Sequence, residues 1–163
     1  GLFGNLFETK KNNRAKLIAE ANVFIQQIKE NKKLSIISHS TVILKNDEKA
    51  FLATASNLME TRSTKGGRDQ NTQEWKQLDT GQLVLTDKRL IFDGTKENRI
   101  IKLNQIISVQ PWIDAIELAV EDRQKSILLS VDNPYIWSSV IRIIIAVKDP
   151  LDLSEVNLNI QLQ

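Results

Sequence analysis

The sequence predicts a mainly β (α+β) domain: a seven-stranded antiparallel sandwich or barrel capped by a C-terminal amphipathic helix, with an additional N-terminal helix. Three observations support this prediction. Apolar residues alternate with other residues in short runs after about residue 49, turn-forming residues separate the runs, and helical spacing is confined to the two ends of the chain. The 163 residues, 41% hydrophobic and 26% charged, suit one ordinary globular domain.

Residues 1–45 are expected to hold a mobile tip, an amphipathic helix and a linker. An apolar stripe at helical spacing predicts a helix over residues 13–30. The stripe consists of Leu17, Ile18, Ala21, Phe24, Ile25 and Ile28. The segment before it contains two glycines and weak helix signals, so we expect it to be mobile.

Residues 46–150 are expected to form the main domain. Its predicted strands are 50–64, 82–86, 89–92, 99–103, 106–112, 115–120 and 127–131. From the second strand onward, corresponding apolar positions recur every 7 to 11 residues. Such close spacing leaves no room for crossover helices, so the strands are predicted to run antiparallel.

The last predicted element is a helix that begins at Asp132-Asn133-Pro134. Asp or Asn can cap free backbone amides, and proline is well tolerated at the first helical position. One apolar stripe follows, at Ile136, Trp137, Val140, Ile141, Ile144 and Val147. Pro150 ends the helix, and residues 151–163 are predicted to form an extended C-terminal extension. A helix of this size suits the open end of a small sandwich, and Trp137 is expected in the core.

Three segments resemble a known family. Residues 81–92 read G-Q-L-V-L-T-D-K-R-L-I-F, and residues 100–109 and 132–137 continue the similarity. The pattern G-x-L-x-L-T-x-x-R-L-I-F is similar to that of bacterial pleckstrin-homology-like and GRAM-like domains. Residues 46–48, Asn-Asp-Glu, stand where such domains tend to show glycine and glutamate. The resemblance covers about residues 47–148 and implies the pleckstrin-homology superfold and a binding role without catalysis.

Composition excludes several classes of protein. The chain has no cysteine and only one histidine, His39, so we expect no disulfide, thiol nucleophile, metal site or cofactor. No uncharged apolar run approaches 18 residues, and no signal peptide is recognisable, so the expected location is cytoplasmic, with peripheral membrane attachment as the alternative. Residues 1–33 carry a charge of +4 against −2 for the remainder, which disfavours nucleic acid as a partner.

Two groups of basic residues are candidates for binding an anion or a lipid headgroup. The first lies in the predicted connection after the first strand, where glycines can expose backbone amides: Arg62, Lys65 and Arg68. The second is the pair Lys88 and Arg89 at the following hairpin. In both places the alternative is a solvated turn whose cations form local salt bridges, bind no ligand and add little to stability.

The N-terminal segment is a candidate for membrane or partner contact. It combines apolar and basic residues: Leu2, Phe3, Leu6, Phe7, Lys10, Lys11, Arg14 and Lys16. Apolar groups beside cations suit the interface of an anionic membrane. The same apolar residues could instead dock the helix on its own domain or on a second copy of the chain.

Residues 79–81, Asp-Thr-Gly, match the short signature of aspartic peptidases. The chain holds no second such turn, so a carboxylate pair would need a homodimer, which makes a peptidase using Asp79 a remote alternative. We therefore expect no enzyme. The preferred function is a binding or scaffolding module that associates with itself or with a protein partner, through an exposed sheet edge or through apolar helix faces.

Overall fold

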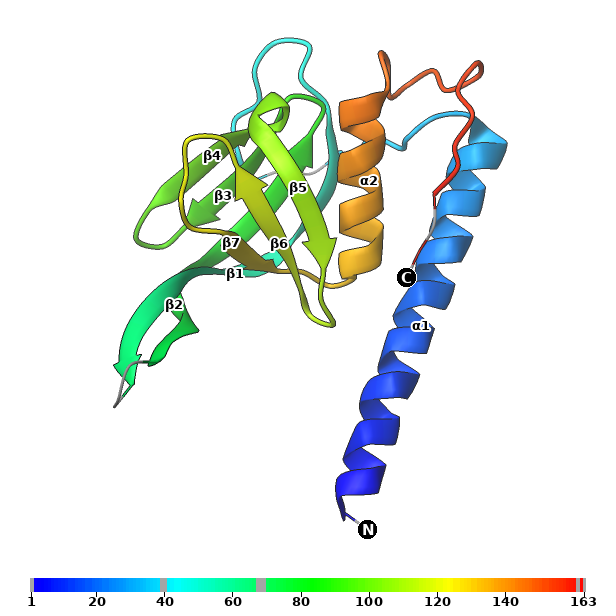
Figure 1. The fold of residues 1–163 in the computed structure, drawn as a ribbon. Coiled ribbons are helices and arrows are strands. Elements are labelled where there is room, and N and C mark those ends of the chain that lie inside the picture. The colour runs from blue at the N-terminus through cyan, green and yellow to red at the C-terminus, as the bar shows by residue number, and fades with distance from the viewer. Residues whose placement is uncertain (1, 39–40, 67–69, 161, 163) are drawn as a thin grey trace.

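The described residues form seven antiparallel strands and two α-helices, which confirms the predicted fold class (Figure 1). The structure is a computed structural model that describes residues 2–38, 41–66, 70–160 and 162; the side chains of residues 2–10, 62–66 and 70–73 are not described. The elements are α1 (Leu2–Asn31), β1 (Ala50–Gly66), β2 (Gln70–Thr86), β3 (Arg89–Gly94), β4 (Asn98–Lys102), the 3₁₀ turn η1 (Leu103–Gln105), β5 (Ile106–Pro111), β6 (Ala115–Val120), β7 (Ile127–Ser130) and α2 (Pro134–Ala146).

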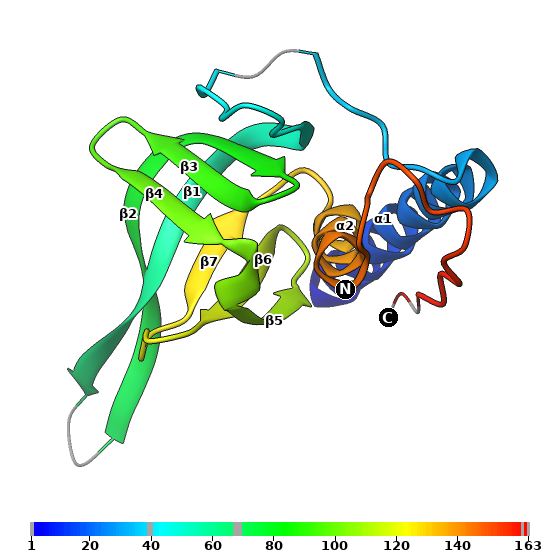
Figure 2. The ribbon, with the colours of Figure 1, turned by 90° about the horizontal axis from the view of Figure 1, so that it is seen from above.

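The strands form one sheet in the order β4-β3-β2-β1-β7-β6-β5, and every neighbouring pair is antiparallel. The sheet curves, and α2 packs against β5, β6 and η1 (Figure 2). Although β4 and β5 are consecutive in the chain, they lie at opposite edges of the sheet. This placement leaves two outer strands whose backbone groups are paired on one side only.

One side of the sheet and α2 enclose the core. The largest fully buried side chains include Trp137 from α2 and Phe92 from β3, together with leucines and isoleucines from β1, β2, β6 and β7. Trp137 is 1% exposed, as its predicted core position requires, and its indole N–H donates to Asp132 Oδ1 at 2.8 Å. The predicted cap of α2 is also present, because Asn133 Oδ1 accepts hydrogen bonds from the first backbone amides of the helix.

The second strand is much longer than the sequence analysis predicts. It begins at Gln70 rather than near residue 82 and pairs with β1 along its length, from Ala50↔Thr86 to Gly66↔Gln70. Beyond Glu60, this ribbon has no further strand beside it, and it projects from the sheet (Figures 1 and 2). Residues 70–77 are almost all polar, so they lack the alternation that marks a half-buried strand.

Helix α1 also begins earlier than predicted, at Leu2 instead of about residue 13. Residues 2–12 contain no proline and only one glycine, so nothing in them stops a helix that continues from the amphipathic part. Its first turns extend beyond the rest of the molecule (Figure 1). The amphipathic part docks near α2, where Ala21, Ile25 and Ile28 are buried.

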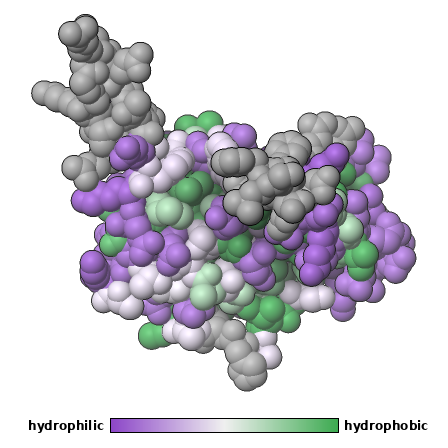
Figure 3. All heavy atoms as spheres, turned by 90° about the horizontal axis from the view of Figure 1, so that it is seen from below, coloured by the Kyte–Doolittle hydropathy of each residue, from purple (hydrophilic) through white to green (hydrophobic). Residues whose placement is uncertain are grey.

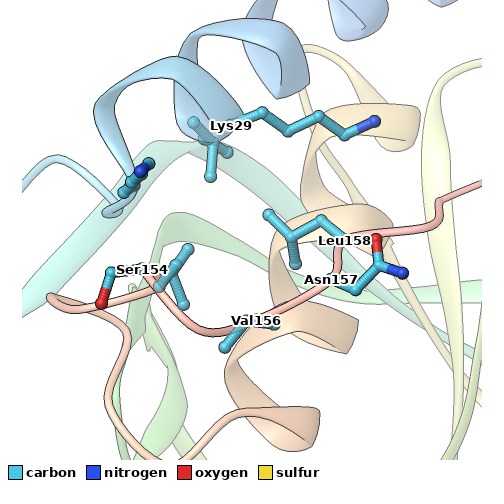
Figure 4. Close-up of a pocket in the computed structure, with 8 residues that line it drawn as sticks. Lys29, Ser154, Val156, Asn157 and Leu158 are labelled. Atoms are coloured by element: carbon cyan, nitrogen blue, oxygen red, sulfur yellow. The ribbon is translucent and has the colours of Figure 1, made fainter.

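The C-terminal segment runs back along the end of α1. Leu34 N–H donates to Pro150 O at 2.9 Å, and Leu153 N–H donates to Lys32 O at 2.7 Å. Leu153 is buried, and a cavity of about 280 Å³ separates the last turns of α1 from residues 153–158 (Figure 4). Lys29 lines this cavity from the side of the helix, and Ser154, Val156, Asn157 and Leu158 line it from the side of the C-terminal segment.

Candidate binding site at the β4 edge

A buried carboxylate, Glu48, anchors the start of the β3–β4 hairpin. Arg89 binds it through two hydrogen bonds, Nε to Oε2 at 2.8 Å and Nη2 to Oε1 at 2.9 Å. The hydroxyl of Thr86 donates to Oε2 at 2.6 Å, and Lys45 N–H donates to Oε1 at 2.9 Å. Burial alone would raise the pKa of Glu48, but the hydrogen bonds from Arg89, Thr86 and Lys45 outweigh it and lower the pKa to about 2.

A second buried carboxylate, Asp79, anchors the other end of the same hairpin. Its Oδ1 accepts from Thr80 N–H at 2.8 Å and from the Thr95 hydroxyl at 2.7 Å, and its Oδ2 accepts from Lys96 N–H at 2.9 Å and from Glu97 N–H at 3.0 Å. Burial would raise the pKa of Asp79, yet these four donors hold it well below its usual range. The contacts fit a structural carboxylate that fixes the β3–β4 turn, whereas a peptidase dyad needs a carboxylate free to share a proton.

Two glycines let the turn approach this carboxylate. A side chain at Gly94 would collide with Asp79 Oδ2 and with Glu97 O, and one at Gly81 would collide with the backbone of Asp93. The Asp-Thr-Gly sequence at 79–81 therefore has a packing explanation: the aspartate fixes the turn, and the glycine allows β2 and β3 to come close.

The backbone pattern of β4 shows which of its groups face the open edge. Leu103 N–H donates to Lys88 O, and Gly94 N–H donates to Glu97 O, so these are hydrogen-bonded pairs of the β3–β4 ladder. Because such pairs alternate with non-hydrogen-bonded ones in an antiparallel ladder, the intervening positions of β4 turn their backbone N–H and C=O away from β3. Those positions are Asn98, Ile100 and Lys102. Within the described residues, no hydrogen bond reaches these outward groups.

The side chains beside this edge form an amphipathic groove, which we call the β4 groove. It has a volume of about 930 Å³ and lies between the start of β3, the end of β4 and the last turns of α2. Its apolar lining includes Ile100, which is 57% exposed, and Ile145, which is 45% exposed. Its remaining lining residues are Lys45, Asp87, Lys88, Arg89, Lys102, Leu103, Asn104 and Ile144.

The β4 groove carries more positive than negative charge. Among the described residues, none of the ammonium groups of Lys45, Lys88 and Lys102 has an acidic partner within 4.0 Å. Arg89 is different, because its guanidinium is bound to Glu48 and its side chain is only 12% exposed. The cations of the groove without an acidic partner are therefore the lysines, and Asp87 is the only acid among the described residues that line it.

The opposite edge of the sheet, β5, is blunted. The bond from Trp112 N–H to Ala115 O marks a hydrogen-bonded pair, so the residues with outward backbone groups in the regular part of β5 are Val109 and Pro111. Arg142 of α2 donates to Val109 O at 2.6 Å, and proline has no N–H to offer. Proline and a covering helix are devices by which proteins protect sheet edges, so β4 is the edge left available.

The basic residues that were predicted to bind an anion lie in different environments. Lys88 and Arg89 both line the β4 groove, but the guanidinium of Arg89 is bound to the buried Glu48, 41 residues earlier in the chain. Arg62 and Lys65 lie in β1, in the projecting ribbon and not in a connecting loop, because β2 begins at Gln70. The side chains of Arg62 and Lys65 and the whole of Arg68 lie outside the described residues.

The basic residues of α1 are only partly available for binding. Lys11 and Lys16 are exposed, whereas Arg14 Nε donates to the hydroxyl of the buried Tyr135 at 3.0 Å. Arg14 thus has a structural role in docking α1 against α2. The other residues of the predicted contact patch belong to α1, but their side chains lie outside the described residues: Leu2, Phe3, Leu6, Phe7 and Lys10.

Sequence reasoning missed Lys45, Ile100 and Lys102 as members of one site. The sequence predicts Ile100 only as a strand residue, and nothing in the sequence shows that β4 is an edge strand. The sequence holds a weak signal that these residues lie together. Because successive side chains of a strand point to opposite faces, Asn98, Ile100 and Lys102 share one face of the five-residue strand. Lys45 joins them only because Glu48 holds the preceding linker against Arg89.

Comparisons with known proteins add little. No family model matches the chain, and no curated protein does. Among solved structures, the C-terminal domain of an unknown protein from Leishmania infantum is similar, with 17% sequence identity and a TM-score of 0.38; the alignment covers 58% of this chain and 84% of that one. A TM-score this low does not place the chain in a family. Nor do the described residues contain any cluster of three or more metal-ligating side chains.

Proposed function

We propose that this chain is a non-catalytic binding module that associates with protein by accepting a strand at the open edge of β4. The observation that carries the proposal is the row of outward backbone groups at Asn98, Ile100 and Lys102, beside an isoleucine that is 57% exposed. An unpaired edge of this kind supplies main-chain hydrogen bonds to an added strand, and neighbouring side chains supply selectivity. The resemblance to pleckstrin-homology-like domains is compatible with such a role.

A short peptide tests whether the edge accepts a strand. The probe is a synthetic peptide with the sequence of residues 96–104, and binding is followed by amide chemical shifts of the isotope-labelled chain as the peptide is added up to millimolar concentration. We expect saturable shifts at the amides of residues 98, 100 and 102. Saturable shifts at β5 with none at β4 would contradict the proposal.

Two variants of Ile100 separate edge pairing from loss of fold. Ile100→Pro removes the isoleucine side chain and an outward N–H but no hydrogen bond of the β3–β4 ladder, which an edge strand tolerates. Ile100→Lys places a charge on the edge and leaves the backbone unchanged. We expect both to lose peptide binding while the denaturation midpoint stays close to that of the parent chain. Ile107→Lys, a matched exposed isoleucine in β5, should leave peptide binding unchanged.

Peripheral attachment to an anionic membrane is a second candidate function. It is favoured by the projection of α1 beyond the body of the molecule and by the exposure of Lys11 and Lys16 (Figure 1). The face drawn in Figure 3 mixes hydrophilic residues with scattered apolar ones, so its coloured residues offer no broad apolar surface for insertion. Among the described residues, no helix has the length and hydropathy needed to cross a bilayer.

Vesicle sedimentation tests the membrane hypothesis. Binding should increase with the fraction of phosphatidylserine in the vesicles and decrease when Lys10, Lys11 and Lys16 are replaced by glutamine. Arg14 should be left intact, because its contact with Tyr135 would mix a structural effect with a loss of charge. Equal sedimentation with neutral and anionic vesicles would exclude this function.

A further inference from the structure

We propose that the strand accepted at the β4 edge is β4 of a second copy of this chain, so that two sheets join into one across a two-fold axis at Ile100. This inference rests on the proposed function, since it requires the same open edge. It goes further by naming the partner, the register and the residues that meet.

The backbone fixes the register. On each copy, the outward groups belong to Asn98, Ile100 and Lys102. In an antiparallel ladder these must face one another as hydrogen-bonded pairs, so Ile100 lies opposite Ile100 of the second copy, and Asn98 lies opposite its Lys102. This arrangement is isologous: each copy uses the same surface, and pairing closes after two subunits.

The side chains match in the same register. Ile100 is exposed in the single chain, so pairing places two exposed isoleucines side by side at the axis and removes apolar surface from water. Isoleucines directly opposite across a strand pair are favourable neighbours, whereas two lysines there would repel. The centre of the edge is therefore compatible with pairing to itself.

Charge complementarity supports a second copy rather than an unrelated strand. Asp93 lies opposite Asn98 at one end of the outer face of the β3–β4 hairpin, and Lys102 lies opposite Arg89 at the other end. Among the described residues, neither Asp93 nor Lys102 has a salt-bridge partner. Two-fold pairing brings Lys102 of each copy beside Asn98 of the other, from where its long side chain can reach Asp93.

The interface is small, so the dimer should be weak. Strand β4 has only five residues, and such a contact lies at the low end of specific interfaces. We expect a weak dimer with a dissociation constant on the order of 10–100 µM. Light scattering should show the mass rising with concentration from 18.5 kDa toward twice that value. A strict monomer at 1 mM would overturn the inference.

Cysteine cross-linking reports the register directly, because the natural chain has no cysteine. In a hydrogen-bonded pair the two Cα atoms lie about 5.5 Å apart, within the range that a disulfide spans. The full-length Ile100→Cys variant should therefore form a covalent dimer under mild oxidation. Ile107→Cys is the matched control, since it is as exposed but lies in β5. Equal cross-linking of both variants would overturn the proposed register.

A charge exchange tests the predicted ion pair. Lys102→Asp and Asp93→Lys should each weaken the dimer by about tenfold, the scale of coupling between contacting residues. The variant carrying both substitutions should recover most of the affinity, because the pair is restored with opposite polarity in each copy. If the double variant did not recover affinity, the ion pair would be contradicted. In that case the two substitutions would weaken the dimer independently, and their effects on the free energy of dimerisation would add.

The two proposals can fail separately. If the peptide of residues 96–104 binds β4 while the full chain stays monomeric, the edge accepts strands but the second copy is excluded as partner. If neither the peptide nor a second copy binds, the binding role of the β4 edge is also wrong. Cross-linking at Ile100 together with recovery by the charge exchange supports both.

Discussion

The two outer strands of the sheet are held in place by different forces. The β3–β4 hairpin is fixed at its ends by buried carboxylates, Glu48 and Asp79, whereas β5 is held by packing against α2 and by Arg142. The anchors at the two ends of the hairpin do not pair the outward backbone groups of β4, although linker residues 41–43 line a pocket beside Asn98 and Ile100. A helix packed on a strand covers it. The difference explains why the outward backbone groups of β4 are less protected than those of β5.

The largest loss of unfolding free energy is expected when Glu48, the buried carboxylate at the start of the β3–β4 hairpin, is removed. Glu48→Ala leaves the part-buried guanidinium of Arg89 without its carboxylate, and breaking such a pair costs about 3–5 kcal/mol. Chemical denaturation should show this loss in the free energy of unfolding. Asp87→Ala is the control in the same region, because this acid accepts one bond from Lys49 N–H at an exposed position, and its removal should cost less than about 1 kcal/mol.

On the β5 side, the largest effect should come from an apolar deletion. Ile141 of α2 is fully buried, so Ile141→Ala should cost about 2–5 kcal/mol through the cavity that it leaves. Ile145 lies on the same helix and is 45% exposed, so Ile145→Ala should cost far less. A similar loss of unfolding free energy in both variants would show that packing of α2 does not hold this side.

The pH dependence of stability should distinguish the two sides. The folded pKa of Glu48, about 2, lies below the ordinary value of 4.5, so its contribution is complete above about pH 4.5 and is lost as the pH falls toward 2. The difference corresponds to roughly 3 kcal/mol. Denaturation between pH 6 and 2 should show this loss in the parent chain and in Ile141→Ala. If a Glu48→Gln variant showed the same dependence of unfolding free energy on pH over this range, the loss of stability would come from groups other than Glu48.

Replacement of Asp79 should loosen one turn and leave the rest of the fold. In Asp79→Asn, one carboxylate oxygen becomes an amide that cannot accept hydrogen bonds, so the amides of Lys96 and Glu97 should exchange faster with solvent. Hydrogen exchange measured by NMR tests this, with the amides of β6 as an internal control. The same variant addresses the remote peptidase hypothesis, because any peptidase activity of the chain that survived it could not depend on Asp79.

The smallest loss of unfolding free energy is expected when Arg142, which hydrogen-bonds to the outer edge of β5, is replaced. Arg142→Ala removes the hydrogen bond to Val109 O, which should cost about 1 kcal/mol or less. Opening this carbonyl should not create a second binding edge, because Pro111 still offers no N–H. Light scattering should therefore show the same concentration dependence as for the parent chain. Larger assemblies in this variant would mean that Arg142, more than Pro111, protects the edge.

The sequence by itself determined the elements whose periodicity reflects burial. Alternating apolar residues located the strands from Leu83 onward, and Asn133-Pro134 located the start of α2, because half-buried strands and capped helices impose a local pattern. The polar half of β2 had no such pattern, since the projecting ribbon has no core beneath it. For the same reason, the extension of α1 to Leu2 was not predicted.

Only the tertiary structure decided which strand is exposed and which cations are free. Lys88 and Arg89 are neighbours in sequence and both line the β4 groove, yet Lys88 has no acidic partner among the described residues, whereas Arg89 neutralises a buried acid 41 residues away. Likewise, nothing local distinguishes β4 from β5 as an open edge. Strand order, burial and long-range ion pairs depend on contacts between residues distant in the chain, and a local pattern does not encode them.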